Sequence, residues 1–156
     1  MQALNYLSIL STSPMQLKPG DPAPSFSLKD QHGKQRALAK KLVIYFYPKD
    51  FTAGCTLEIQ DFAKLYGQFK EKGFEVYGVS PDSVESHSKF CAAYQSDFPL
   101  LSDPQAEVAK TYGAWGKGLL GEGMVRSTFV IENGKITQAW YKVNPLGHAN
   151  WVLKQL

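Results

Sequence analysis

The chain has only two cysteines and three histidines among its 156 residues, which is too few for a disulfide scaffold or a zinc cluster. Cys55 and Cys91 lack the C-x-x-C spacing, and His32, His87 and His148 are scattered. We therefore expect no bound metal. Two well-separated cysteines fit a reducing compartment such as the cytoplasm, where any disulfide is transient.

Long hydrophobic runs and an excess of one charge are also missing. No stretch approaches the roughly 20 apolar residues that a membrane span needs. The 17 Lys and Arg nearly balance the 14 Asp and Glu, and the basic residues form no stripe. These absences argue against membrane insertion and against nucleic-acid binding by charge.

The domain organisation follows from length and composition. With 44% hydrophobic and 20% charged residues, the chain resembles an ordinary globular protein with one core. Residues 1–14 lack any basic residue and therefore make a poor targeting peptide. We expect them to be a loosely ordered extension, and residues 15–156 to be a single domain.

The first half of this domain predicts alternating strands and helices. A short strand is expected at 26–28, and the continuous apolar runs 42–47 and 74–79 read as buried strands. Between these runs, apolar residues recur at helical spacing from Ile59 to Phe69. A second helix is expected after Asp82, which is a suitable N-cap; it would contain Val84, His87, Cys91 and Tyr94.

The second half predicts shorter elements. The expected elements are a strand at 98–101, a helix opened by Asp103 and Pro104, a hairpin around Asn133-Gly134, and a last helix opened by Asn144 and Pro145. Five glycines within 113–123 predict a mobile loop. This order of elements predicts an α/β fold in which a mixed central sheet has helices on both faces.

Cys55 is the most informative residue. The strand before it ends at Pro48, and Thr52 opens a helix three residues before the cysteine. Cys55 would then lie in the first helical turn, where free backbone N–H groups and the helix dipole favour a thiolate. The alternatives are that Cys55 is a buried packing residue and that Thr52 is only a helix cap.

The motif around Cys55 resembles the active site of the peroxiredoxins. Residues 47–56 read Tyr-Pro-Lys-Asp-Phe-Thr-Ala-Gly-Cys-Thr and are most similar to the branch of bacterioferritin comigratory protein and peroxiredoxin Q. Further matches lie at 20–26, 79–83, 98–103 and 126–129, so that the resemblance runs from Met15 to the C-terminus. It implies a thioredoxin-like fold and an enzyme that reduces hydrogen peroxide or organic hydroperoxides without a cofactor.

The resemblance also implies roles for individual residues. Cys55 would be the peroxidatic cysteine that attacks the peroxide and becomes a sulfenic acid. The Thr52 hydroxyl would hydrogen-bond the peroxide, and Arg126 would place its guanidinium beside the thiolate and the leaving oxygen. Pro48 would shield the sulfur from water. From the residues alone, a Cys–His pair with one of the histidines stays open.

Cys91 determines the subtype that the resemblance implies. Many relatives have a second cysteine five residues after the first, but Gln60 stands there in this chain. Another subset has it on the next helix, as in Lys89-Phe90-Cys91. Cys91 would then resolve Cys55 in an intramolecular disulfide, with thioredoxin or a similar dithiol recycling a monomeric enzyme. The alternatives are a one-cysteine peroxidase that uses an external thiol and a thioredoxin-like redox sensor or interaction module.

A disulfide between these helices implies movement. Cys55 opens one helix and Cys91 lies late in another, so we expect their Cα atoms to be farther apart than the roughly 7 Å that a disulfide allows. Local unfolding would then be required. The small residues Val84, Ala92 and Ala93 predict few bulky anchors for the second helix, which we expect to move more.

Overall fold

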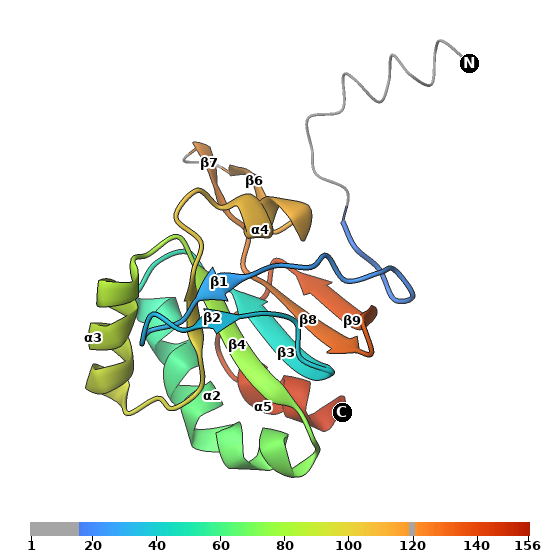
Figure 1. Cartoon of the computed structure of the whole chain (residues 1–156), viewed down its shortest axis with the longest axis horizontal. Coiled ribbons are helices and arrows are strands. Elements are labelled where there is room, and N and C mark those ends of the chain that lie inside the picture. Colours follow the sequence, from blue (N-terminus) through green and yellow to red (C-terminus); the bar gives the residue numbers. More distant parts are fainter. Residues whose placement is uncertain (1–15, 119–120) are drawn as a thin grey trace.

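The computed structural model describes residues 16–118 and 121–156, so the predicted extension at 1–14 lies outside the described residues. A seven-stranded sheet has the order β2-β1-β5-β4-β3-β8-β9 (Figure 1). Its strands are β1 (Leu28–Lys29), β2 (Gln35–Arg36), β3 (Lys41–Phe46), β4 (Glu75–Ser80), β5 (Leu100–Ser102), β8 (Ser127–Glu132) and β9 (Lys135–Tyr141).

The sheet is mixed, and β3 lies between a parallel and an antiparallel neighbour. Strand β3 runs parallel to β4 and antiparallel to β8. The predicted buried runs at 42–47 and 74–79 are confirmed as β3 and β4. Phe46 at the end of β3 pairs with Ser127 at the start of β8. The residue before β8, Arg126, therefore lies next to the loop that follows β3.

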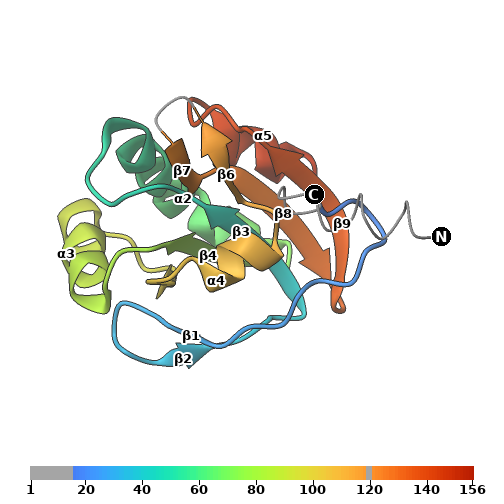
Figure 2. The same cartoon turned by 90° about the horizontal axis from the view of Figure 1, so that it is seen from above.

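Helices cover both faces, which confirms the predicted fold class. The helices are α2 (Ala53–Glu71), α3 (Val84–Tyr94), α4 (Glu107–Thr111) and α5 (His148–Lys154). Alternate β3 residues divide the core: Val43 and Tyr45 pack with residues of α2, α3 and α5, whereas Leu42 and Ile44 pack with α4. Figure 2 shows α2 and α5 on one side of the sheet and α4 on the other.

The N-termini of two later helices differ from the predictions. Helix α3 is capped by Ser83, whose Oγ accepts from the Ser86 N–H at 3.1 Å, because the predicted cap Asp82 accepts from the Asp50 N–H instead. Helix α5 starts after Gly147, because the backbone at Gly147 has a positive φ of 69°.

Helix α4 likewise starts later than its predicted cap. It begins after Ala106, although the Asp103 carboxylate still accepts from the N–H groups of Val108 and Ala109 at 3.3 and 2.9 Å. The carboxylate therefore satisfies backbone N–H groups of the helix from a position farther back in the chain.

The prediction that residues 113–123 form a loop was wrong over most of that range. Strands β6 (Trp115–Gly118) and β7 (Gly121–Met124) form an antiparallel pair. Trp115 and Met124 pack partly against the core on the α4 side, and Lys110 lies over the Trp115 ring. Glycine at alternate positions hides the strand pattern, because it gives no side chain from which a buried face can be recognised.

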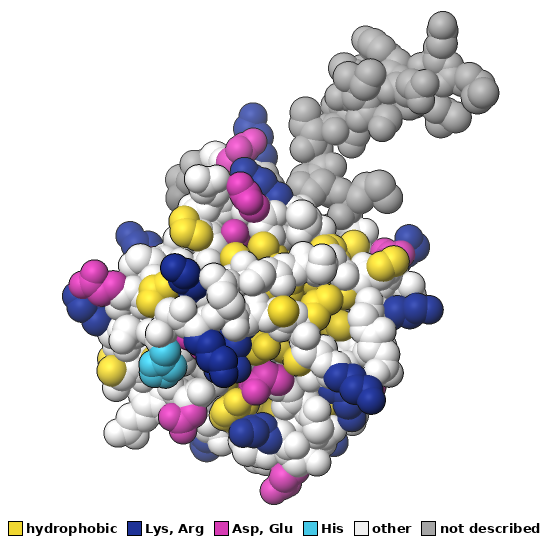
Figure 3. Space-filling model, in the orientation of Figure 1, with side chains coloured by type: hydrophobic (Ala, Val, Ile, Leu, Met, Phe, Trp, Pro, Cys, Tyr) yellow, Lys and Arg dark blue, Asp and Glu magenta, His cyan; other side chains and the backbone are white. Residues whose placement is uncertain are grey.

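The described surface mixes its side-chain types. In Figure 3, basic and acidic side chains are interspersed on the visible face, and hydrophobic side chains gather near its centre. Among the described residues, no helix combines the length and the apolar character needed to cross a membrane.

Candidate active site

Cys55 is the third residue of α2, as the spacing predicted. Thr52 is the N-cap residue with extended backbone angles, and its carbonyl accepts from the Thr56 N–H at 2.8 Å. The Cys55 side chain is only 1% exposed. The sulfur therefore lies in a largely dehydrated first turn, where the backbone N–H groups have no helical acceptors of their own.

Arg126 contacts this sulfur from the start of β8. Its Nη2 lies 3.4 Å from the Cys55 Sγ, and its Nη1 pairs with the Glu58 Oε1. Although burial opposes it, the charges of Glu58 and Cys55 raise the pKa of Arg126 above that of a free arginine. A fixed cation at the sulfur stabilises the negative charge of a thiolate.

Glu58 is a residue of the site that the sequence analysis missed. It lies one turn after Cys55 on α2 and is fully buried, and among residues 16–118 and 121–156 its Oε2 has no hydrogen-bond partner. Burial raises the pKa of Glu58 to about 7, with Arg126 opposing the shift. The sequence did contain a signal for a buried acidic residue, because Glu58 lies at helical spacing on the apolar face that also carries Cys55, Ile59 and Phe62.

The hydroxyl of Thr52 does not cap α2. It donates to the Lys49 carbonyl at 2.7 Å, so the cap prediction holds for the position of Thr52 but not for its side chain. The only hydrogen of the hydroxyl is therefore engaged. The Thr52 oxygen keeps lone pairs with which it can accept a hydrogen bond from a ligand O–H group.

Pro48 lies directly after β3, at the entrance to the loop that leads to Cys55. Its own side chain is exposed, whereas the preceding Tyr47 is buried and donates its N–H to the Val79 carbonyl at 3.0 Å. This hydrogen bond extends the pairing of β3 with β4 by one residue. The loop at 48–52, below called the Cys55 loop, thus leaves the sheet at a fixed point.

Cys91 lies on α3 and faces the same core as Cys55. It is 6% exposed, and both cysteines are free. Burial, reinforced by the charge of Asp50, raises the pKa of Cys91 to about 12. Helix α3 is also better anchored than its small residues predicted, because His87 and Phe90 are fully buried.

Two of the histidines have buried partners that the sequence did not indicate. His87 pairs with Asp50, and His148 Nε2 lies 2.8 Å from the Thr128 hydroxyl oxygen. Burial, and then the charge of Arg126, lowers the pKa of His148 to about 4. Within residues 16–118 and 121–156, the side chain that hydrogen-bonds the Cys55 sulfur is Arg126, so the Cys–His alternative is not supported.

The chain is similar to proteins of one well-populated family. Residues 19–139 match the model of the AhpC/TSA family. A putative peroxiredoxin bcp from Helicobacter pylori is 43% identical over 150 residues, which cover 90% of this chain and 99% of the relative. Peroxiredoxin Bcp from Bacillus subtilis is 37% identical over 153 residues, which cover 91% and 96%.

Solved structures agree with this assignment. The bacterioferritin comigratory protein of Xanthomonas campestris, studied for its alkyl peroxide reduction activity, aligns with a TM-score of 0.82 and 36% identity over 91% of this chain and 96% of its own. A mutant peroxiredoxin Q from Xylella fastidiosa aligns with a TM-score of 0.86 and 34% identity over 90% and 96%. The chain therefore belongs to the peroxiredoxins of the AhpC/TSA family, in the branch of bacterioferritin comigratory protein and peroxiredoxin Q, and is a thiol peroxidase.

Proposed function

We propose that this peroxiredoxin is a two-cysteine enzyme that reduces hydrogen peroxide and organic hydroperoxides through a Cys55 sulfenic acid, which Cys91 resolves. The observation that carries the first half is the 3.4 Å contact between Arg126 Nη2 and Cys55 Sγ in the first turn of α2. A packing cysteine needs no buried cation at its sulfur, whereas a nucleophilic thiolate does.

In the first step, the Cys55 thiolate attacks one oxygen of the peroxide. The O–O bond breaks, the sulfur is oxidised to a sulfenic acid, and the other oxygen leaves as hydroxide or alkoxide and takes up a proton. Arg126 stabilises charge on the leaving oxygen, and the Thr52 oxygen accepts a hydrogen bond from the peroxide O–H. In the proposal, Pro48 limits the access of water to the sulfur.

In the second step, the Cys91 thiol condenses with the sulfenic acid. The S–O bond of Cys55 breaks, a disulfide forms between Cys55 and Cys91, and one water molecule is released. In support, peroxiredoxin Q of Xanthomonas campestris has been solved with serine at either of two cysteines that are 36 residues apart. Cys55 and Cys91 have the same separation in this chain.

Organic hydroperoxides are included because an apolar surface adjoins the site. Pro145 approaches Gly54 beside Arg126, and the next residue, Leu146, is 73% exposed. Leu146 and Trp151 line a hollow of about 480 Å³ together with Trp140 and His148. Such a surface can accommodate the alkyl part of a hydroperoxide while its O–O bond faces Cys55.

We propose that an external dithiol completes the cycle. Thioredoxin or a related protein exchanges with the Cys55–Cys91 disulfide, which restores both thiols and leaves the partner oxidised. We further propose that the enzyme is a monomer. We place it in the cytoplasm, because two free buried cysteines suit a reducing compartment.

Steady-state peroxide consumption tests this function. The wild type should turn over with thioredoxin as the only reductant, Cys55→Ser should be inactive with any thiol, and Cys91→Ser should keep activity only with a small thiol such as dithiothreitol. Unchanged thioredoxin-dependent turnover in Cys91→Ser would instead support a one-cysteine enzyme. A wild type that is oxidised once and does not turn over with either reductant would support the redox-sensor alternative.

A further inference from the structure

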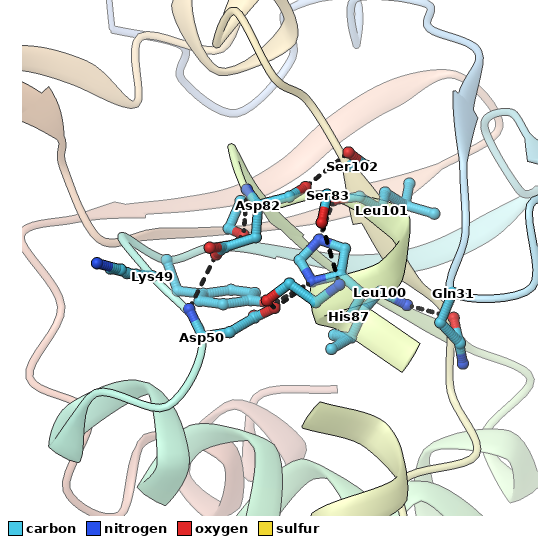
Figure 4. Close-up of polar contacts among 12 residues, drawn as sticks. Gln31, Lys49, Asp50, Asp82, Ser83, His87, Leu100, Leu101 and Ser102 are labelled. Atoms are coloured by element: carbon cyan, nitrogen blue, oxygen red, sulfur yellow. Dashed lines mark hydrogen bonds and ion pairs between the residues drawn. The ribbon is translucent and has the colours of Figure 1, made fainter. Parts of the chain in front are cut away.

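A buried polar cluster lies between the Cys55 loop and α3, outside the set of residues assigned to peroxide reduction (Figure 4). Asp50 Oδ2 lies 2.7 Å from His87 Nδ1 and accepts from the Ser86 hydroxyl at 2.8 Å. Asp50 Oδ1 accepts from the Tyr47 hydroxyl at 2.6 Å. The side chains of Asp50 and His87 are 1% and 0% exposed.

The hydrogen bonds of His87 determine how many protons the pair holds. His87 Nε2 lies 3.0 Å from the Leu101 carbonyl, which only accepts, so Nε2 carries a hydrogen. On the other side, Nδ1 faces Asp50, and a second proton must lie between the two atoms because otherwise two lone pairs would meet at 2.7 Å. Asp50 and His87 therefore form a buried pair without net charge, and separating them would leave each without its hydrogen-bond partner.

The neighbouring groups complete the hydrogen bonding around this pair. Burial raises the pKa of Tyr47 well above that of a free tyrosine, so its hydroxyl remains a donor to Asp50. Asp82, the other nearby carboxylate, accepts from the Asp50 N–H and the Ser80 hydroxyl. Asp50, Asp82 and His87 have ligand atoms within 4.8 Å of one another, but hydrogen bonds already engage them.

The cluster joins the two segments that carry the cysteines. Asp50 belongs to the Cys55 loop, and His87 precedes Cys91 by one turn on the same face of α3. A second contact reinforces the first, because the rings of Phe51 and Phe90 have centroids 4.9 Å apart. Phe51 has a φ of 65°, so the loop is held in a conformation that a non-glycine residue adopts at a cost.

We propose that Asp50 and His87 are a positioning pair that fastens the Cys55 loop to α3 during peroxide reduction and whose separation sets the rate at which Cys91 reaches Cys55. While the pair is closed, the first turn of α2 keeps the shape that places Cys55 beside Arg126, and Cys91 stays buried. When the pair opens, the strained backbone at Phe51 relaxes and α3 is released. The second half of this inference rests on the proposed resolution by Cys91.

The test uses His87→Gln and Asp50→Asn in the reduced full-length protein. His87→Gln removes the imidazole that bonds both Asp50 and the Leu101 carbonyl, and Asp50→Asn removes the carboxylate that lies against Nδ1. In each variant we expect disulfide formation after one equivalent of hydrogen peroxide to accelerate by roughly tenfold, because a broken buried pair favours local opening. Over-oxidation at high peroxide should fall, and the double variant should be no faster than either single one.

A matched control separates this role from general destabilisation. Ile131 is buried on the opposite face of the sheet, and Ile131→Val or Ile131→Ala can be chosen to match the urea midpoint of His87→Gln. The control should form the disulfide at the wild-type rate. Acceleration by the control as large as that in His87→Gln would overturn the proposal.

Hydrogen exchange tests the pair even if the proposed disulfide is wrong. In the reduced state, the amides of residues 84–94 should exchange faster in His87→Gln than in the wild type and in the Ile131 control. A wild type that forms no Cys55–Cys91 disulfide would contradict the proposed function but leave this comparison decisive. Unchanged exchange in His87→Gln would overturn the positioning pair.

Discussion

The α-carbon of Gly54 faces the guanidinium of Arg126 so closely that a β-carbon on it would lie 3.0 Å from Nη2. Pro145 closes the other side, with its Cγ 3.1 Å from the same point. Alanine is the better helix former, so glycine at this position of α2 is explained by the space that Arg126 needs to reach Cys55.

Gly54→Ala should therefore slow the reaction without weakening the fold. The added methyl group displaces the guanidinium by a few tenths of an ångström, and we expect sulfenic acid formation to slow by roughly tenfold, because reacting groups tolerate little misplacement. Helix propensity alone would stabilise the variant by about 0.5–1 kcal/mol. Stopped-flow kinetics with hydrogen peroxide and urea unfolding measure the two effects.

Gly67→Ala is the control for this prediction. Gly67 lies on the same helix, and a β-carbon there would meet no atom of the described part of the chain within 4 Å. The variant should gain a similar amount of stability and react with peroxide at the wild-type rate. Equal rates for Gly54→Ala and Gly67→Ala would contradict the steric argument.

Glu58 should make the stability depend on pH. Its pKa is raised from 4.5 to about 7 in the folded protein, so the folded protein holds a proton that the unfolded chain has already released between these values. Stability should therefore fall as the pH rises through this window, by up to about 3 kcal/mol. In Glu58→Gln the dependence should be weaker. Urea midpoints across the window test this, and parallel curves for both proteins would refute it.

Arg126→Ala should lose activity and stability for different reasons. Sulfenic acid formation should slow by about 100-fold or more, because the cation beside the reacting sulfur is lost. The fold should also be weakened by about 1–3 kcal/mol, since the buried Glu58 carboxyl keeps its proton near neutral pH but loses the hydrogen-bond partner of its Oε1.

The same change in a Glu58→Gln background separates the two effects. There the kinetic loss should persist, whereas above pH 7 the loss of stability should shrink, because glutamine cannot carry the charge that a buried Glu58 without Arg126 would bear unpaired. Single-turnover kinetics and urea unfolding of the four proteins of this cycle provide the check. A rate in Arg126→Ala equal to that of the wild type would remove Arg126 from the mechanism.

Sequence patterns predicted what depends on neighbours along the chain. The apolar run of β3, the helical period of α2 and the position of Cys55 in its first turn are local features, and the structure has them as expected. Pairings across long separations were missed. Asp50 and His87 lie 37 residues apart, and Glu58 and Arg126 lie 68 residues apart, so no local pattern connects them.

The buried state of Cys91 leads to a prediction for its chemistry. Its pKa is raised to about 12 and its side chain is 6% exposed, so few thiolates are present and few are accessible. In Cys55→Ser, iodoacetamide at pH 8 should modify Cys91 at least about 100-fold more slowly than in urea. Equal rates in the folded and unfolded states would show that α3 is already open.

The mass of the wild-type protein after one equivalent of hydrogen peroxide tests the central claim most directly. Conversion of Cys55 to a sulfenic acid and its condensation with Cys91 should leave a monomer lighter by two hydrogen atoms, and digestion should yield one peptide pair linked through Cys55 and Cys91. A product that has instead gained one oxygen atom on Cys55, with Cys91 still a free thiol, would contradict the account.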